Sequence, residues 1–283
     1  MRLGVNGHLP YKDPDEWIRL VLDLDVGAVT APMSHTDPPE VKKAYMDHVR
    51  RYGLVIGEVG IWKNPIAPDP AERAAAIEYS KARLALADEI GANCCVNVAG
   101  AAGPDWAGYY PENYSDDTYG LLIDTIRGII DAVRPRRTFY TVEPMQWMHP
   151  DSPDDCLRLM RDIDRRAVGV HLDCANMING IERYRNRAAF VEECFRKLGA
   201  HVKSIHAKDV ALGPESPCCL REVEPGKGGM DFAQTLRLAH GLSPDMPVFV
   251  EHLPDLDTYR RAVGHLRRTA ADNGIGENRP TRG

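Results

Sequence analysis

The chain has 283 residues, of which 43% are hydrophobic and 27% are charged, values that are ordinary for a globular protein. Its formal net charge of -6 argues against the basic surface that a nucleic-acid partner would need. We find no secretion-signal pattern and no run of about 18 apolar residues, so we expect neither secretion nor a membrane partner. The seven cysteines lack the spacing of a disulfide framework, which predicts reduced thiols and a cytoplasmic location.

Strand and helix patterns alternate along the whole chain. Short apolar runs, rich in β-branched and aromatic residues, predict strands at 2–7, 26–31, 54–60, 92–99, 138–143, 168–173, 202–206 and 247–251. Between them, apolar residues recur at the helical period and predict helices at 15–24, 39–52, 69–90, 117–133, 153–163, 187–198, 232–240 and 257–271. Helix starts are marked by a capping side chain before a first-turn proline, as in Asp13-Pro14, Asp69-Pro70 and Ser152-Pro153.

Eight β/α units of this size predict the α/β class and a closed (β/α)8 barrel, the TIM barrel, as one domain over residues 1–273. A doubly wound open sheet shares the alternation of strands and helices. An eight-fold repeat with functional residue types at the strand ends favours the closed barrel. Residues 274–283 contain glycine and proline without periodicity, and this composition predicts a disordered tail.

Side chains of metal-ligand type stand at the ends of four successive strands: Glu143, Asp173, His206 and Glu251. Because the carboxyl ends of parallel strands meet on one rim of a barrel, residues far apart in sequence can converge on one ion there. Three carboxylates and one imidazole make an oxygen-rich site that suits Mn2+, Mg2+ or Co2+, and Zn2+ is also chemically compatible. The pattern predicts one divalent metal ion and metal-assisted catalysis.

Aromatic and polar residues follow several other strands. Trp62, Trp106 and Trp147 would either form an apolar wall against a sugar ring or pack their loops onto the barrel. Glu58, at the end of the third strand, is a further polar group on the predicted rim, and polar groups there suit a polyhydroxylated ligand. The nucleotide motifs GxGxxG and GxxxxGK[ST] and the serine motif GxSxG do not occur. We therefore expect a small sugar-like substrate.

Several of these motifs resemble the xylose-isomerase-like TIM barrels, a group that holds ketose 3-epimerases, inosose isomerases and dehydratases, hydroxypyruvate isomerase and endonuclease IV. The resemblance covers residues 2–270. It rests on the segments Val142-Glu143-Pro144, His171-Leu172-Asp173, Ile205-His206-Ala207-Lys208-Asp209, Pro225-Gly226-Lys227-Gly228 and Val250-Glu251. In the epimerases of that group the metal ligands are a glutamate, an aspartate, a histidine and a glutamate, which match Glu143, Asp173, His206 and Glu251.

The resemblance implies a divalent-metal-dependent isomerase or epimerase of a sugar, keto-sugar or cyclitol. The metal would chelate a carbonyl and a neighbouring hydroxyl of the substrate and stabilise an enediolate intermediate. Glu143 and Glu251 lie on opposite sides of the metal in the related epimerases. They would act as the catalytic acid and base, one removing a proton and the other returning one.

The chain departs from the ketose 3-epimerases at two positions that contact the substrate in them. Asn176 replaces a histidine three residues after the strand-6 aspartate, and His149 replaces a glutamate six residues after the strand-5 glutamate. His149 would either be a catalytic proton carrier near neutral pH or a solvated loop residue.

Two basic residues are further candidates for substrate binding. Lys208 shares the strand face of His206 and would either bind a substrate oxygen or form a rim ion pair with Asp209 or Glu58. Arg221 would either bind a hydroxyl or phosphate of the substrate or be solvated.

Other functions compatible with the resemblance remain open. The nearest alternative is a metal-dependent lyase or dehydratase of a keto-sugar or keto-glycoside, similar to C-glycoside deglycosidases, with His149 as an extra acid. A non-catalytic sugar-binding subunit and a DNA-repair enzyme similar to endonuclease IV are less favoured, the latter because of the net acidity and the single predicted site. Related barrels form dimers or tetramers, and some act with a second type of subunit, so the resemblance implies such partners here.

Overall fold

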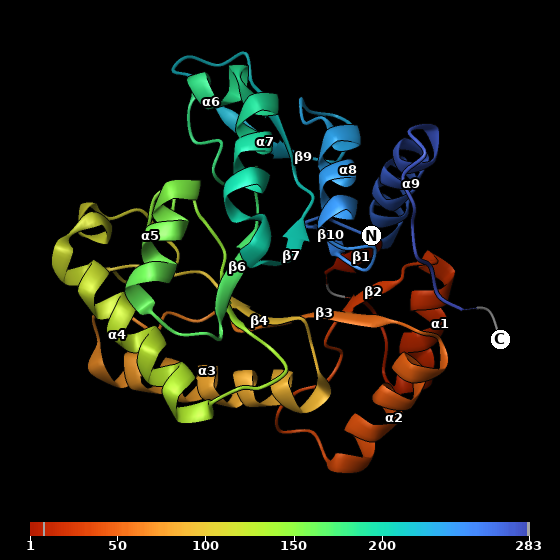
Figure 1. Ribbon diagram of the computed structural model, residues 1–283, viewed down its shortest axis with the longest axis horizontal. Coiled ribbons are helices and arrows are strands. Elements are labelled where there is room, and N and C mark those ends of the chain that lie inside the picture. Colours follow the sequence, from red (N-terminus) through yellow and green to blue (C-terminus); the bar gives the residue numbers. More distant parts are fainter. Residues whose placement is uncertain (8, 282–283) are drawn as a thin grey trace.

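The computed structural model describes residues 1–7 and 9–281, and within them eight parallel strands close into a barrel surrounded by helices (Figure 1). Around the barrel the strands follow the order β1-β10-β7-β6-β5-β4-β3-β2. The predicted (β/α)8 barrel and each of its predicted strands are confirmed, with differences of a few residues at the strand ends. The barrel strands are β1 (Arg2–Asn6), β2 (Ala28–Thr30), β3 (Val55–Gly60), β4 (Cys94–Asn97), β5 (Tyr140–Val142), β6 (Val168–Leu172), β7 (Val202–His206) and β10 (Pro247–Glu251).

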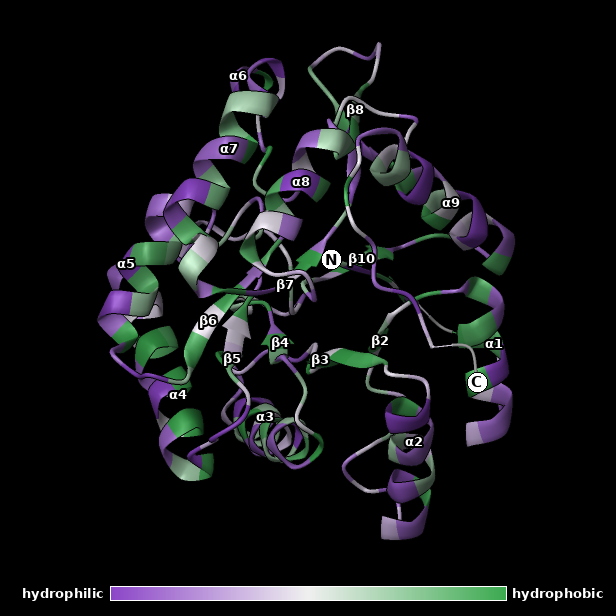
Figure 2. Ribbon diagram, turned by 45° about the vertical axis from the view of Figure 1, so that its right-hand side comes forward, coloured by the Kyte–Doolittle hydropathy of each residue, from purple (hydrophilic) through white to green (hydrophobic). Residues whose placement is uncertain are grey.

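The helices form a ring outside the strands and turn their apolar residues toward them (Figure 2). The predicted caps are formed, since the side chains of Asp13, Asp69 and Ser152 accept hydrogen bonds from backbone N–H groups in the first turn of the helices that follow them. All predicted helices are present: α1 (Pro14–Leu24), α2 (Pro39–Arg51), α3 (Pro70–Ile90), α4 (Asp116–Val133), α5 (Pro153–Ile163), α7 (Arg187–Leu198), α8 (Phe232–Leu242) and α9 (Leu256–Asp272). Three short helices were not predicted: η1 (Pro111–Tyr114), α6 (Ile181–Arg185) and η2 (Gly199–His201).

The interior of the barrel is filled by side chains. Phe249 on β10 is fully buried, and a Cβ atom added to Gly4 or Gly57 would lie only 2.4 or 2.6 Å from its ring. These two glycines therefore make room for the aromatic ring in the middle of the barrel. Since this interior is packed, a ligand has access to the barrel at its rim, where the carboxyl ends of the strands lie.

A two-stranded antiparallel hairpin, β8 (Asp209–Leu212) and β9 (Leu220–Val223), follows β7 and was not predicted from the sequence. The carboxylate of Asp209 at its base accepts hydrogen bonds of 2.8–2.9 Å from the backbone N–H groups of Val210, Gly226, Gly228 and Met230. A Cβ atom on Gly228 would lie 2.3 Å from this carboxylate, so glycine permits the close approach. Asp209 therefore anchors both ends of the long segment after β7.

Residues 274–281 contain no helix or strand, yet they pack against the barrel. The N-terminal amino group of Met1 donates to the carbonyl oxygen of Gly276, and the backbone N–H of Asn278 donates to the carbonyl oxygen of Met1. Glu277 accepts hydrogen bonds from the guanidinium of Arg267. Composition alone does not reveal such tertiary partners. The predicted disordered tail also includes residues 282 and 283, which lie outside the described residues.

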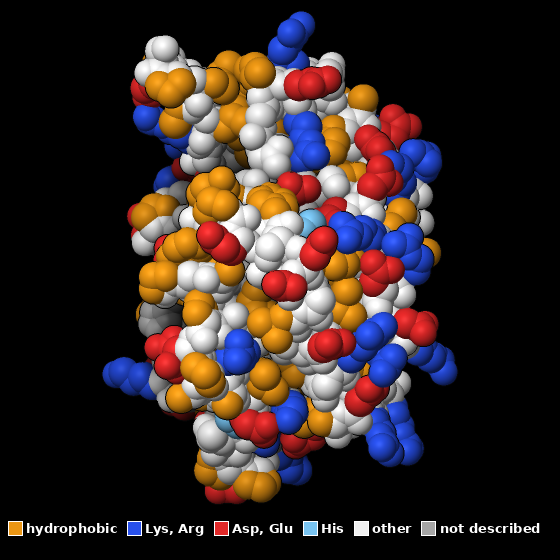
Figure 3. Space-filling model, turned by 90° about the vertical axis from the view of Figure 1, so that its left-hand side faces the viewer, with side chains coloured by type: hydrophobic (Ala, Val, Ile, Leu, Met, Phe, Trp, Pro, Cys, Tyr) orange, Lys and Arg blue, Asp and Glu red, His pale blue; other side chains and the backbone are white. Residues whose placement is uncertain are grey.

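Other expectations concern the surface and the thiols. None of the described helices combines the length and the apolar character that crossing a membrane requires. All seven cysteines are free thiols, as predicted, and five of them are buried. On the face drawn in Figure 3, Lys and Arg side chains are interspersed with Asp and Glu, so both signs of charge occur together there.

Candidate metal centre and substrate site

The structure brings the four predicted metal ligands together at the carboxyl ends of adjacent barrel strands. Glu143 and Asp173 directly follow β5 and β6, whereas His206 and Glu251 are the last residues of β7 and β10. One ligand atom from each residue lies within 4.8 Å of the others, and all four side chains are buried. The Nδ1 atom of His206 is 2.9 Å from Glu251 Oε1, 3.3 Å from Glu143 Oε1 and 4.0 Å from Asp173 Oδ2.

These residues fit a divalent cation. Asp173 Oδ2 and Glu251 Oε1 are fully buried, and neither accepts a hydrogen bond of good geometry. Both oxygens lie near the ammonium of Lys208, at 3.1 and 2.7 Å, and a divalent ion would compensate the charge of the buried carboxylates more fully, because burial removes the water that would otherwise solvate it. Three carboxylates and one imidazole form a donor set suited to Mg2+, Mn2+ or a similar hard ion. The cluster could thus hold one metal ion.

Lys208 extends into the same carboxylate cluster. Its Nζ atom lies 2.7 Å from Glu251 Oε1, 3.1 Å from Asp173 Oδ2 and 3.9 Å from Glu143 Oε1, and it donates a hydrogen bond of 3.1 Å to Asn176 Oδ1. Burial opposes the charged ammonium, but these carboxylates outweigh burial and raise the pKa of Lys208. Its ion pairs are therefore with the predicted metal ligands, and the expected rim pair with Asp209 or Glu58 is not formed.

The two glutamates of the cluster differ in their electrostatic environments. Burial raises the pKa of Glu143, and the nearby His206 offsets this only in part. Burial acts on Glu251 in the same direction, but the positive charges of His206 and Lys208 outweigh it and lower the pKa of Glu251. For His206, burial is outweighed by Glu251, Glu143 and Glu58, which raise its pKa well above its ordinary value.

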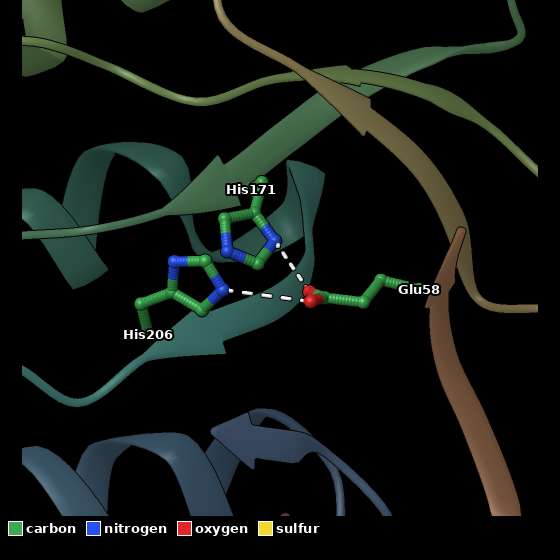
Figure 4. Close-up of side chains that lie close together, drawn as sticks. All are labelled: Glu58, His171 and His206. Carbon is green, nitrogen blue, oxygen red and sulfur yellow. Dashed lines mark ion pairs between the residues drawn. The ribbon is translucent and has the colours of Figure 1, made fainter. Parts of the chain in front are cut away.

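A buried polar layer lies beneath the metal centre, where Glu58 from β3 points between His171 from β6 and His206 from β7 (Figure 4). Glu58 Oε1 is 3.5 Å from His206 Nε2, and Glu58 Oε2 is 3.4 Å from His171 Nδ1. These three residues form a second group with metal-ligand spacing among the described residues. Burial lowers the pKa of His171 well below its ordinary value, so this imidazole is neutral.

The predicted role of Glu58 in substrate binding stays a prediction, and its position favours a contact with His206. Only 1% of the residue is exposed, and it is not among the residues that line the two cavities described below. It instead lies next to the ring nitrogen of His206 that points away from the metal ligands. A carboxylate in that place would orient the imidazole so that its other nitrogen faces an ion held by the four predicted ligands.

Above the four ligands lies a cavity of about 670 Å³, here called the inner cavity. Its volume is in the usual range for small-ligand sites, about 300–1,000 Å³. The predicted substrate-binding residues Trp62, Trp106, Asn176 and Lys208 line it together with Glu143 and Glu251. A polar floor with tryptophans on its walls suits a sugar, whose ring has polar edges and an apolar face.

Trp62 reaches this cavity through an uncommon backbone conformation. Its φ angle of 51° lies in the left-handed region, which bulky residues rarely adopt. A Cβ atom on Gly60 would lie 2.2 Å from the indole Nε1 of Trp62, so the indole lies directly over this glycine. Such local strain is common where a side chain is held in place for ligand binding.

A second cavity of about 490 Å³, here called the outer cavity, adjoins the first. The predicted residues Trp147 and Arg221 line the outer cavity, and Asn176 and Lys208 line both cavities. Asn176 also donates a hydrogen bond of 3.0 Å to Glu143 Oε1, which connects both cavities to the four predicted metal ligands.

His149 is the predicted catalytic residue that the structure does not bring to the site. Its Nδ1 atom is 2.6 Å from Asp155 Oδ2, and its ring packs between the rings of Tyr114 and Tyr119 at centroid distances of 5.1 and 5.0 Å. It is not among the residues that line the inner or the outer cavity. The carboxylate on α5 and the two tyrosines hold the imidazole in a packed position, so the catalytic role of His149 stays a prediction that the geometry of the site does not support.

Some residues of the site were missed or undervalued in the sequence. Asn6 donates to Glu251 Oε2 at 3.3 Å and its amide nitrogen lies 3.1 Å from His206 Nε2. Tyr259 lines the inner cavity and donates a hydrogen bond of 2.9 Å to the carbonyl oxygen of Asn6. His252 also lines it, with a positive φ angle of 55°. The available signal was position, since Asn6 and His252 stand at or directly after the ends of barrel strands.

The fold is similar to that of several solved structures. A D-tagatose 3-epimerase-like protein is 19% identical with a TM-score of 0.70, and the match covers 97% of this chain and 98% of that one. A 3-keto-D-glucoside 4-epimerase from E. coli is 15% identical with a TM-score of 0.68, covering 95% and 99%. A xylose isomerase-like TIM barrel protein from Mycobacterium smegmatis, solved in complex with magnesium, is 16% identical with a TM-score of 0.65, covering 95% and 92%.

At these identities the likeness to solved structures establishes the fold alone. No curated protein matches the sequence. The family model described as xylose isomerase-like TIM barrel matches residues 17–269, which is most of the chain. This chain therefore belongs to the xylose isomerase-like TIM barrel family.

Proposed function

We propose that this protein is a divalent-metal-dependent isomerase or epimerase of a sugar, keto-sugar or cyclitol that works through an enediolate intermediate. The observation that carries the proposal is the pairing of Glu143 and Glu251 around one buried imidazole, at 3.3 and 2.9 Å from His206 Nδ1, at the base of a tryptophan-walled cavity. Several structural neighbours are named as 3-epimerases or a 4-epimerase of sugars, which supports this class of reaction.

The residues of the site would have three roles: binding the metal, transferring protons and holding the substrate. An ion bound by Glu143, Asp173, His206 and Glu251 would supply Lewis-acid stabilisation of negative charge on the substrate oxygens. Glu143 and Glu251, which come from different strands, would remove a proton from the carbon next to the carbonyl and return one to it or to its neighbour. Lys208 and Asn176, which face the cavity, would hold substrate hydroxyl groups.

The lyase alternative differs in the fate of the same intermediate, which would expel a substituent instead of accepting a proton. That alternative relied on His149 as an additional acid, and His149 is held away from the inner cavity by Asp155. Retention of both glutamates beneath the cavity likewise favours a catalytic role over a sugar-binding subunit. We therefore retain isomerisation or epimerisation as the proposal.

The test is proton NMR in D2O with Mg2+-loaded protein and a panel of ketoses, inososes and keto-glycosides, with a Mn2+-loaded sample followed by chromatography. We expect deuterium to enter at a carbon next to the carbonyl and a rearranged sugar to form. Glu143→Gln and Glu251→Gln should each abolish this exchange, whereas Glu112→Gln, an exposed glutamate on η1, should not. Loss of water or of an aglycone would show a lyase. Absence of exchange in protein with a confirmed bound metal would refute the proposal.

A further inference from the structure

The outer cavity adjoins the inner cavity, since Asn176 and Lys208 line both. The two volumes, about 490 and 670 Å³, each fall within the range of a complete small-ligand site. A single sugar ring held over Glu143 and Glu251 would occupy the inner cavity and leave the outer one to a different part of the ligand. The paired cavities thus fit a substrate of two joined units.

The walls of the outer cavity are the segment before α6 and the β8–β9 hairpin, two additions to the basic β/α repeat. Arg183 fixes the first wall by donating to the carbonyl oxygens of Met177 and Asp151 at 2.7 and 2.8 Å and to Asn179 Oδ1 at 3.1 Å. Asp209 fixes the base of the second wall through its four backbone hydrogen bonds. Hydrogen bonds to the backbone therefore hold both of these walls of the outer cavity in place.

The lining of the outer cavity combines apolar surface with polar groups at its edges. Trp147, Ile178 and Leu220 supply the apolar surface, and Gln146 and Asn179 supply amide groups. The charged residues of the lining already have ion-pair partners: Lys208 lies against Asp173 and Glu251, Arg221 against Glu215, and Glu222 against His252. Such a lining suits a ring, whether an aromatic ring or a second sugar, more than a phosphate or another small charged group. The acid and base candidates Glu143 and Glu251 line only the inner cavity of the two, which assigns the reacting ring to the inner cavity.

We infer that the substrate is a glycoside: its ketone-bearing sugar ring binds in the inner cavity, and its aglycone or second sugar ring binds in the outer cavity. The inference rests on the proposed function for the reaction itself. It adds a second binding site that selects glycosides over free monosaccharides. Because Asn176 and Lys208 line both cavities, the bond between the two units would pass beside their side chains.

Gly180 offers a way to fill the outer cavity. It lines that cavity, its φ angle of -168° is extended backbone that any residue adopts, and a Cβ atom added to it meets no atom within 4 Å. Gly180→Trp should therefore occupy the outer cavity without disturbing the inner one. Gly180→Ala is the matched control, and Gly180→Leu is a smaller obstruction in case the tryptophan variant does not fold.

The experiment compares deuterium exchange by Mg2+-loaded protein on a keto-disaccharide, an aryl keto-glycoside and the corresponding keto-monosaccharide. In the wild type, kcat/KM should be at least about tenfold higher for one or both glycosides than for the monosaccharide. Gly180→Trp should lower kcat/KM for the preferred glycoside by about tenfold or more and change the monosaccharide value less than about twofold. The preferred glycoside identifies the second unit as a sugar or an aromatic ring.

Equal use of all three compounds by the wild type, or an equal loss on all three in Gly180→Trp, would overturn the inference. Absence of exchange with every compound would refute the proposed function, and glycoside binding would then be measured by saturation-transfer NMR. Binding that Gly180→Trp abolishes and Gly180→Ala preserves would support the outer site on its own. No binding of either glycoside to the wild type would overturn the outer site as well.

Discussion

Lys208 offers the sharpest test of the electrostatics of the metal centre. Lys208→Met keeps a long apolar side chain but removes the ammonium that lies 2.7, 3.1 and 3.9 Å from three buried carboxylates. At an effective dielectric constant of about 20, each of these attractions amounts to roughly 4–6 kcal/mol. The cost of burying the ammonium offsets much of this, and breaking a buried ion pair by removing one partner destabilises by about 3–5 kcal/mol. We expect the free energy of unfolding to fall by about that amount in the absence of metal.

The assay is urea denaturation followed by tryptophan fluorescence, once with EDTA and once with excess Mn2+. The matched control is Lys197→Met, because Lys197 also pairs with two carboxylates, at 2.6 and 2.7 Å, but on the surface. That control should cost much less stability, because solvent screens a surface ion pair. Because the carboxylates raise the pKa of Lys208, its contribution to stability is fully present below the ordinary lysine pKa of about 10.4, and therefore at neutral pH, and is lost only as the pH rises above that value.

Bound metal should reduce the loss of folding stability caused by Lys208→Met. A divalent ion bound by the same carboxylate oxygens would neutralise the charge that the variant leaves unpaired, so the deficit should be smaller with Mn2+ than with EDTA. The reasoning is refuted if Lys208→Met loses no more stability than Lys197→Met in EDTA, or if its deficit is the same with and without Mn2+.

Three further predictions concern the surroundings of the metal centre. Glu58→Gln should weaken Mn2+ binding about 10–100-fold, as measured by calorimetry, because the group that orients His206 loses its charge. An unchanged Mn2+ affinity would show that Glu58 does not orient His206 for metal binding. Asp209→Ala should lower the free energy of unfolding by more than about 3 kcal/mol in urea denaturation, because four backbone N–H groups lose a charged acceptor. The control is Asp231→Ala, which removes a helix cap and should lower the free energy of unfolding by about 1 kcal/mol. Since the carboxylates raise the pKa of His206, this imidazole is protonated in metal-free protein at neutral pH, and Mn2+ binding should release its proton. Mn2+ affinity should therefore rise with pH by up to about tenfold per unit, and calorimetry in two buffers of different ionisation heat that detected no proton release would contradict it.

The four metal-ligand candidates could be found in the sequence because their placement depends on few assumptions. Each stands at the carboxyl end of a short apolar run, and a parallel barrel brings such ends to one rim whatever the connecting helices and loops do. Periodicity locates the runs, and barrel closure supplies the proximity. Of this group, His206 and Glu251 are the last residues of their strands, as predicted.

Glu58 shows where this reasoning stops. The alternation of side chains along a strand predicts which face a residue takes, but it does not predict how deep in the barrel the residue lies. β3 continues for two residues after Glu58, to Gly60, so Glu58 lies one layer below the rim that His206 occupies. The register between β2 and β3 also shifts between Val29 and Thr30, and no sequence pattern predicts this shift. For these reasons the sequence pattern predicted that Glu58 would contact the substrate, whereas in the structure it faces the imidazole of His206.

Tertiary contacts of several loops and of the C-terminal segment also could not be predicted from the sequence. The loop between β8 and β9 runs from Gly213 to Cys219 and lacks the two-residue turn signal by which short hairpins are recognised. Similarly, the packing of residues 274–281 depends on Met1 and Tyr52, at the other end of the barrel sequence. His149 was open to two interpretations because its partner Asp155 and the rings of Tyr114 and Tyr119 are brought to it by the fold.

The adjacent residues Lys208 and Asp209 connect the chemistry of the site to its walls. Because neighbouring residues in extended backbone point in opposite directions, Lys208 reaches the carboxylates of the metal centre while Asp209 turns toward the segment that holds Gly226 and Gly228. That segment closes the base of the β8–β9 hairpin, which forms one wall of the outer cavity. A displacement of the hairpin would thus be transmitted to the ammonium through one peptide unit. Changes that select a different second unit of the substrate are therefore expected to alter the metal centre as well, unless they spare the anchor at Asp209.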